Sequence, residues 1–155
     1  MTLTKIFSAM EKGPEAIDAN FKALEQLASL SEVQKATTHT DGITFVNGAT
    51  SSDAHYTVAV FGKLKIVHFD GGFKGIDIRG SGASGFAKIP ASVLSGTFLS
   101  AMGTVHHNGM GGYVDVSVNT LTGDLTVTAI AASGGDGIHN DLVWSGSCSV
   151  LLEVD

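Results

Sequence analysis

Apolar residues recur at helical spacing near the start of the chain. The residues at this spacing are Ile17, Phe21, Leu24 and Ala28. Separations of four, three and four positions place them in one narrow stripe of a helix, and Pro14 precedes the stripe at a position that favours a helix start. The pattern predicts a helix that packs either on the rest of the chain or against copies of itself near a symmetry axis.

Beyond residue 40 the pattern changes to an alternation of apolar and polar residues, which is typical of strands that bury one face. The alternation is clearest near the end of the chain. The positions that share one parity there are Trp144, Cys148, Val150, Leu152 and Val154. The same alternation spans residues 56–61, 64–69, 113–118 and 125–129.

Glycine turn signals separate these stretches, at residues 70–72 (Asp-Gly-Gly) and 122–124 (Thr-Gly-Asp). The sequence therefore predicts a mainly β protein, in which an N-terminal α-helix is followed by an antiparallel β-sandwich or jelly-roll-like head. We divide the chain into a helical leader, residues 1–40, and a β head, residues 41–155. We expect a connector near residues 31–42.

The composition excludes two classes of partner. The 155 residues carry nine basic and fifteen acidic side chains, a formal net charge of -6, whereas a protein that grips nucleic acid needs a positive surface. No apolar run is long enough to cross a membrane, so we expect no membrane insertion. Charged residues make up only 15% of the chain, which favours burial of some surface in an oligomer.

One short motif matches a known nucleotide-binding pattern but lacks the local structure which that pattern needs. Residues 80–85 match the dinucleotide fingerprint G-x-G-x-x-G, but an extended run stopped by Pro90 follows instead of the required helix, so we expect a flexible surface loop.

The six histidines show no zinc-ligand spacing, and we predict neither a metal site nor a cofactor. In a strand, His106 and His107 point to opposite faces. A threefold axis beside one of them would gather three imidazoles around an ion, but ordinary polar positions explain the pair better.

The densest polar cluster of the predicted head lies in residues 134–144. Its candidate ligand-binding residues are Asp136, His139, Asn140, Asp141 and Trp144. Proteins bind saccharides with carboxylates and imidazoles on the hydroxyls and aromatic rings under the C–H faces, so the cluster is a candidate saccharide site. The alternative is a solvated hairpin loop with Trp144 in the core. Trp144 alternates in step with Cys148, Val150 and Leu152, and this favours a core position for its side chain.

The charge pattern also restricts the ligand. No cation follows Lys88 in the chain, so an anionic polymer would be repelled from the 134–144 loop unless an earlier cation folds back beside it. The candidates for such a cation are Lys63, Lys65, Lys74 and Arg79. We expect a neutral saccharide, or a polymer with glycerol or amino substituents.

Catalysis is not expected. A glycosidase needs two carboxylates across a cleft, whereas the predicted head offers Asp136 and Asp141 on one loop and has its only glutamate, Glu153, near the end of the chain. No G-x-S-x-G elbow is present, and Cys148 lies among apolar neighbours of an alternating strand. We therefore predict a protein that is not an enzyme.

Several short motifs occur in the same order as in a known class of protein. The leader contains a Glu-Ala-Ile-x-x-Asn-Phe core that ends in Ala-Leu, at Glu15, Ala16, Ile17, Asn20, Phe21, Ala23 and Leu24. The head contains an apolar pair before a glycine, an Ile-Pro element and two alternating strands around a glycine turn, at Ile66-Val67, Gly71, Ile89-Pro90, Val114 to Val118, Gly123 and Leu125 to Ile130. In these features the chain resembles the receptor-binding, host-adhesion proteins of tailed-bacteriophage tails and baseplates. Ala91-Ser92-Val93 stands where that class has an Arg or Tyr beside the proline, and no long shaft separates leader from head, which favours a compact tail-tip or baseplate component.

The resemblance implies a homotrimer whose leader helices bundle on the threefold axis through Ile17, Phe21, Leu24 and Ala28. It also implies attachment of the leader to another phage tail or baseplate protein, adhesion of the head to a host cell-surface saccharide, and a place in the virion after synthesis in the bacterial cytoplasm. Three alternatives stay open. They are an architectural tail protein without saccharide affinity, a tail enzyme that degrades host glycans, and a non-viral trimeric jelly roll of the tumour-necrosis-factor type.

Overall fold

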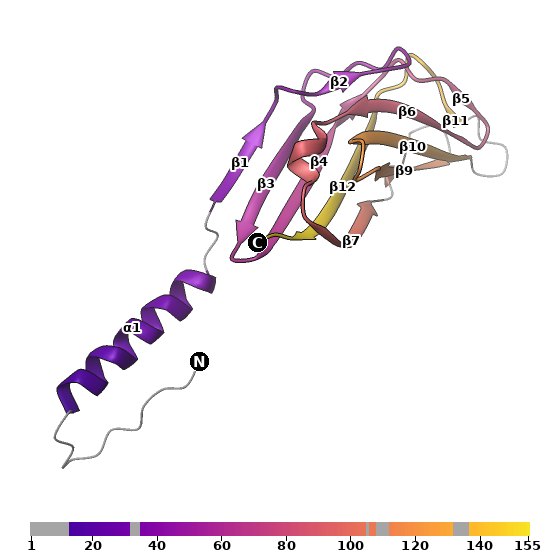
Figure 1. The fold of residues 1–155 in the computed structure, drawn as a ribbon. Helices are drawn as coiled ribbons and strands as arrows, with labels where there is room; N and C mark the ends of the chain where they lie inside the picture. Colours follow the sequence, from indigo (N-terminus) through magenta and orange to yellow (C-terminus); the bar gives the residue numbers. More distant parts are fainter. Residues whose placement is uncertain (1–12, 32–34, 105, 108–111, 132–136) are drawn as a thin grey trace.

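A helix followed by an antiparallel β head makes up the computed structural model in Figure 1, which describes residues 13–31, 35–104, 106–107, 112–131 and 137–155. The helix is α1 (Gly13–Ser31). In the described residues, the first five-stranded sheet has the order β1 (Lys35–His39), β3 (His55–Phe61), β4 (Leu64–Phe73), β12 (Trp144–Glu153) and β7 (Thr97–Thr104). The second has the order β2 (Thr44–Phe45), β6 (Gly82–Lys88), β10 (Asp124–Ala131), β9 (Gly112–Val118) and β8 (His106–His107). A ribbon pairs β5 (Ile78–Arg79) with β11 (Gly137–Ile138), and a short 3-10 helix, η1 (Ala91–Leu94), follows β6.

The two sheets enclose the core, as the alternating sequence predicts. Trp144, Cys148, Val150 and Leu152 form the inner row of β12 and are at most 4% exposed. The inner rows of β9 and β10, in the second sheet, are fully buried at Val114, Val116, Leu125, Val127 and Ala129. The predicted fold class, a mainly antiparallel β head after an N-terminal helix, is confirmed.

An aromatic cluster joins the sheets at the end of the core that lies away from α1. Trp144 of β12 packs against Phe73 of β4, with ring centroids 4.9 Å apart, and against Phe86 of β6 at 5.2 Å. Phe69 completes the cluster at 6.0 Å from Phe86. Because these rings come from both sheets, the cluster holds the sandwich closed.

The turn predicted at residues 70–72 is wrong, since β4 continues through both glycines to Phe73. At Gly71, packing and not a change of chain direction requires glycine. A Cβ on Gly71 would lie 2.7 Å from the ring of Phe73 and 2.9 Å from the Cα of Ala54. Glycine inside a strand often marks such a close approach of backbone. The turn predicted at residues 122–124 is confirmed, and Gly123 adopts a φ of +75° beside the carbonyl oxygen of Ile89.

Two further local predictions are corrected. The loop predicted over residues 80–85 contains the start of β6, which pairs with β10 from Gly82 onward because Phe86 and Ala87 bury their side chains in the core. Strand β6 continues after Gly85 to Lys88, so no helix N-terminus lies directly behind the dinucleotide fingerprint to hold a phosphate. The connector predicted near residues 31–42 contains β1, which pairs with β3 along its whole length.

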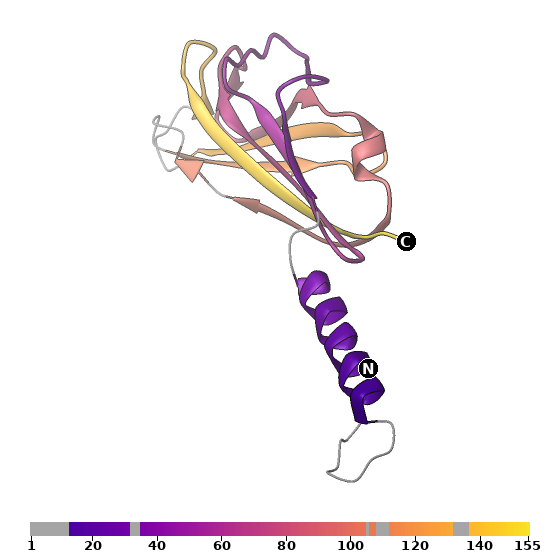
Figure 2. The ribbon, with the colours of Figure 1, turned by 90° about the vertical axis from the view of Figure 1, so that its left-hand side faces the viewer.

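Helix α1 extends away from the head in two perpendicular views (Figures 1 and 2). Ile17, Phe21 and Leu24, here called the helix stripe, are 43%, 63% and 47% exposed. The side chain of Ala28 lies outside the described residues. Packing of the stripe on its own head, one of the two alternatives raised by the sequence, is therefore not what the structure has. None of the described helices is both long and apolar enough to span a membrane.

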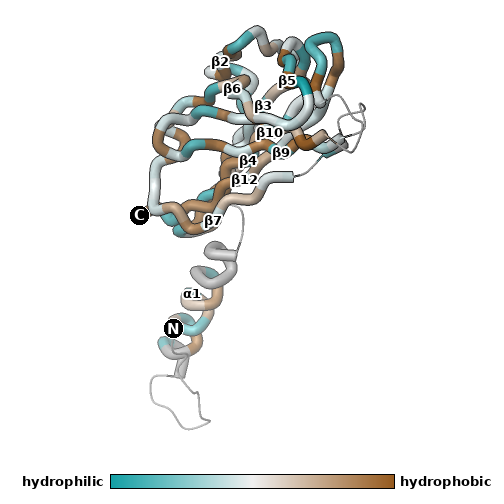
Figure 3. Tube along the Cα trace, turned by 90° about the vertical axis from the view of Figure 1, so that its right-hand side faces the viewer, coloured by the Kyte–Doolittle hydropathy of each residue, from teal (hydrophilic) through white to brown (hydrophobic). Residues whose placement is uncertain are grey.

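Strand β7 presents a second exposed apolar surface. It is the last strand of the first sheet, and every residue along it is exposed. Phe98, Leu99 and Met102, here called the β7 surface, are 52%, 45% and 71% exposed. Figure 3 shows hydrophobic residues along β7, β12 and β4. Exposed apolar edge strands are typical sites of association between chains, so the β7 surface is a candidate contact surface.

The burial of Cys148 leads to a first prediction. Desolvation, followed by the charge of Asp115, raises the pKa of the Cys148 thiol from 9.0 to about 12. Since the thiolate is the reactive form and burial also blocks access, the native chain should react with a disulfide reagent at pH 8 at least about ten-fold more slowly than the urea-unfolded chain. Absorbance of the released thiolate measures both rates. A native rate close to the unfolded one would show that β12 opens readily.

Candidate functional site at the tip of the head

Three segments that are far apart in the sequence meet at the end of the head away from α1 (Figure 1). Thr50 and Lys74 exchange two backbone hydrogen bonds, of 2.9 and 3.0 Å. The backbone N–H of Gly75 donates to the carbonyl oxygen of Asn140 at 2.9 Å, and Leu142 closes a turn on His139. These bonds bring the loop before β3, the end of β4 and the loop before β12 together.

A cavity of about 250 Å³ lies between these segments, and we call it the tip pocket. Its lining residues are Thr50, Ser51, Ser52, Gly72, Phe73, Lys74 and Val143. Val143 is 67% exposed and Lys74 is also exposed, whereas Phe73 belongs to the core. The pocket thus combines hydroxyl groups, one ammonium and one exposed apolar side chain.

Asp53 lies beside the tip pocket and is held by its neighbours. Its Oδ1 accepts hydrogen bonds from the Gly72 backbone N–H and from the Ser51 hydroxyl, both at 3.0 Å. These two bonds, in that order, hold the pKa of the Asp53 carboxyl below its usual 3.8. The group is therefore ionised at neutral pH, and Oδ2 makes no hydrogen bond to the described residues. It can accept one from a ligand hydroxyl.

A second polar group lies next to the tip pocket, where β5 pairs with β11. Arg79 donates from Nε to Asp77 Oδ1 at 2.9 Å. Its Nη1 lies 3.1 Å from Nδ1 and 3.0 Å from Nε2 of His139. Since one nitrogen is nearly equidistant from both ring nitrogens, the guanidinium lies against the imidazole of His139 and links the β5–β11 ribbon to the loop before β12.

The structure separates the site residues that the sequence grouped together. His139, Asn140 and Asp141 lie at the tip, half-buried or exposed, as a ligand site requires. Asp136 lies outside the described residues. Trp144 is 2% exposed and packed between Phe73 and Phe86, so it presents no free ring face to a sugar. The assignment of Trp144 as a ligand contact is corrected, and the core position favoured by its parity is the one observed.

The charge at the tip also differs from the expectation. Lys74 lines the tip pocket and Arg79 contacts His139, so two earlier cations fold back beside the loop that has none of its own. This is the condition under which an anionic polymer would not be repelled. With Asp53, Asp77 and Asp141 nearby, the tip is mixed in charge, and the electrostatic preference for a neutral saccharide no longer follows.

Sequence reasoning missed the Ser51-Ser52-Asp53 segment, and it named Lys74 only as one of four cations that could fold back beside the 134–144 loop. The segment precedes a strand and consists of residues typical of turns, which is the signal by which it could have been noticed. Lys74 carries no such local signal. Its place in the site depends on the pairing with Thr50, which no short-range pattern predicts.

The described histidines do not form a metal centre. Within the described residues, no group of three or more His, Cys, Asp or Glu side chains is arranged to hold an ion. His106 lies within hydrogen-bond distance of the hydroxyls of Ser147, at 3.2 Å, and Ser145, at 3.3 Å. The side chain of His107 lies outside the described residues. These contacts lie within one chain, so an ion held by three copies of a histidine on a threefold axis is not tested by them.

Comparison with solved structures identifies a similar fold. The chain is similar to the crystal structure of the receptor binding protein (gp15) of Listeria phage PSA, with a TM-score of 0.50 and 16% sequence identity, over 94% of this chain and 82% of that one. The sequence matches no protein-family model and no curated protein. At this identity the likeness shows the fold alone, and the chain therefore shares its fold with a protein described as a phage receptor binding protein.

Proposed function

We propose that the chain is a receptor-binding component of a phage tail or baseplate, which adheres to a saccharide on the host surface and catalyses no reaction. The observation that carries the proposal is the similarity of fold to a phage receptor binding protein over 94% of the chain. The order of short leader and head motifs supports it independently of the fold, because it is a feature of the sequence.

The chemistry of the tip pocket supports a saccharide as the ligand. Sugar rings present hydroxyls that both donate and accept hydrogen bonds, together with small apolar C–H faces. The tip offers the Asp53 carboxylate, the Ser51 and Ser52 hydroxyls and the Lys74 ammonium for the hydroxyls, and Val143 for an apolar face. A few polar groups placed around an apolar contact are typical of small-ligand sites.

The exposed surfaces support a homotrimer, which is part of the same proposal. The helix stripe and the β7 surface are two separate apolar areas that a single chain leaves in water. Bundling of α1 about a threefold axis would cover the stripe, and contact between neighbouring heads would cover the β7 surface. Three tips would then act together, so each needs only weak affinity for the saccharide. The leader would carry the attachment to another tail or baseplate protein.

Titration with purified bacterial surface saccharides tests the tip as the binding site. We expect Lys74→Ala to weaken binding of a soluble monovalent saccharide by about ten-fold, since hydrogen bonds to charged groups contribute about 1.5 kcal/mol or more, and His139→Ala to weaken it by about five-fold, since a typical hydrogen bond contributes about 1 kcal/mol. Lys63→Ala, at an exposed lysine at the other end of β4, is the matched control and should bind normally. Calorimetry on a panel from a glycan array measures these affinities.

The same experiments separate the alternatives. A trimer that binds no saccharide of the panel and no bacterial cell would be an architectural tail protein. Release of reducing sugar from a surface polymer would identify a tail enzyme. Saccharide density in soaked crystals at a place other than the tip pocket and the His139 loop would end the site assignment.

A further inference from the structure

Lys65 lies in a row of β4 that is otherwise apolar. The inward-facing row of this strand consists of Lys65, Val67, Phe69, Gly71 and Phe73, and Lys65 is only 8% exposed. Its ammonium donates to the carbonyl oxygen of Ser95 and lies 3.2 Å from the Ser95 hydroxyl. No carboxylate of the described residues forms an ion pair with it. Desolvation by burial lowers the pKa of Lys65. A buried cation without a counter-ion is costly, and apolar residues usually fill such positions.

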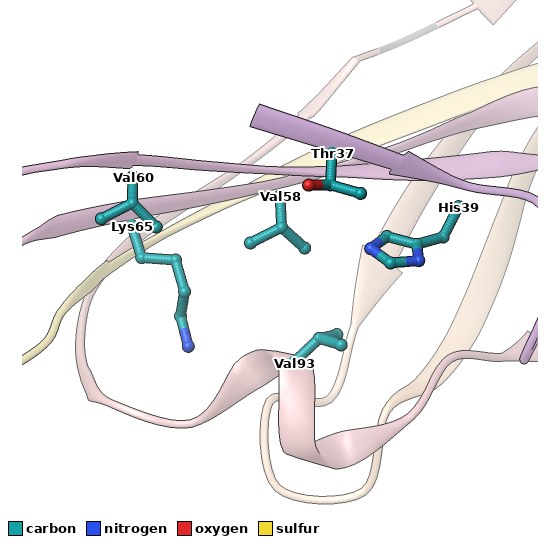
Figure 4. Close-up of a pocket in the computed structure, with 6 residues that line it drawn as sticks. All are labelled: Thr37, His39, Val58, Val60, Lys65 and Val93. Carbon is teal, nitrogen blue, oxygen red and sulfur yellow. The ribbon is translucent and has the colours of Figure 1, made fainter. Parts of the chain in front are cut away.

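A cavity of about 290 Å³ opens beside this ammonium, between the inner face of the first sheet and η1 (Figure 4). Val58 and Val60 of β3 and Val93 beneath them form apolar walls. Thr37 and His39 of β1 line the remaining side. At about 30 Å³ for each water-sized group, the space holds about ten such groups.

The wall formed by His39 is held in place. The imidazole stacks on Tyr56, with ring centroids 4.9 Å apart and an angle of 15° between the planes. Its Nδ1 lies 3.6 Å from Oδ1 of Asp41, which is almost fully exposed. The cavity is therefore apolar in the middle, with the Lys65 ammonium on one side and the imidazole on another.

We propose that this cavity is a binding site for a small amphiphilic carboxylate, whose charged end pairs with the Lys65 ammonium and whose apolar part lies against Val58, Val60 and Val93. Each other class of ligand leaves part of the site unmatched. A sugar would place hydroxyls against three valines, a cation would be repelled, and a neutral apolar molecule would leave the ammonium without a counter-ion.

This site is separate from the tip pocket. Lys65 and Phe73 stand eight residues apart on β4, which corresponds to about 26 Å along a strand. The carboxylate site therefore lies at the end of the head nearer to α1, and occupying it leaves the tip open. The proposal does not depend on whether the tip binds a saccharide.

Titration of the full-length chain with octanoate tests the site. We expect saturable changes in the methyl NMR signals of Val58, Val60 and Val93. Octylamine, which is of similar length and has the opposite charge, should bind at least ten-fold more weakly. Equal affinity for the two compounds would overturn the proposal, because it would reduce the site to an apolar surface.

Variants assign the charge requirement to one residue. Lys65→Met keeps an unbranched side chain and removes the ammonium, and we expect it to weaken octanoate binding at least ten-fold. Lys63→Met, at an exposed lysine two residues away, is the control and should leave the affinity unchanged. Val93→Trp should abolish binding by filling the cavity while Lys65 remains. Thermal unfolding of each variant confirms that the head is folded. A folded Lys65→Met variant with unchanged affinity, or octanoate density elsewhere in soaked crystals, would overturn the assignment.

Discussion

Replacing Trp144 with alanine should lower the free energy of unfolding by about 3–5 kcal/mol, the usual range for removal of a large buried aromatic side chain. Trp144 is 2% exposed and contacts Phe73 and Phe86, which belong to opposite sheets. The substitution leaves a cavity where the aromatic cluster holds the sandwich closed. Denaturant unfolding followed by circular dichroism measures the change, since Trp144 is the chain's only tryptophan and its fluorescence is lost with it.

Trp144→Phe is the matched control for this experiment. The indole Nε1 is buried and has no hydrogen-bond partner within the described structure. Phenylalanine keeps an aromatic ring and removes this unpaired donor, so it should cost less than half as much stability as alanine. A Trp144→Ala variant with unchanged stability and reduced saccharide binding would contradict the core position and restore Trp144 to the ligand site.

The β12 row shows what the sequence can predict about this fold. Trp144, Cys148, Val150 and Leu152 alternate with serines or other residues over one strand, and the period of two reports directly which face is buried. A different local rule, the glycine turn signal, failed at Gly71 and Gly72. The close contact that requires glycine at position 71 comes in part from Ala54, on another segment, and glycines at a turn and at a close approach look alike in a sequence.

The candidate site was less predictable than the fold for a related reason. The 134–144 loop was found because its polar residues are adjacent in the sequence. Its side chains form only part of the tip. Val143 of this loop meets Ser51 and Lys74 there because backbone hydrogen bonds join their distant segments. The charge around the loop could not be predicted for the same reason, since Arg79 reaches His139 across sixty positions of sequence.

The second large effect is expected at the helix stripe. We expect the native chain to have a mass of about 48 kDa in solution, as a closed trimer of 15.9 kDa subunits would. Phe21 is 63% exposed on α1 and is the most exposed residue of the stripe. Phe21→Glu would bring three carboxylates close to one axis, where each loses hydration and repels the others, so the variant should dissociate. Light scattering at micromolar concentration measures both masses.

Two further variants decide which surface carries the assembly. Phe21→Leu keeps an apolar side chain and a good helix former, so it should remain a trimer. Met102→Glu places a charge on the β7 surface, 71% exposed in the single chain, and should weaken the contact between heads while the α1 bundle holds. Dissociation by Met102→Glu, with Phe21→Glu still trimeric, would move the main subunit contact from the helix to β7. A native mass near 15.9 kDa would contradict the trimer itself, and both apolar surfaces would then need a different protein to cover them.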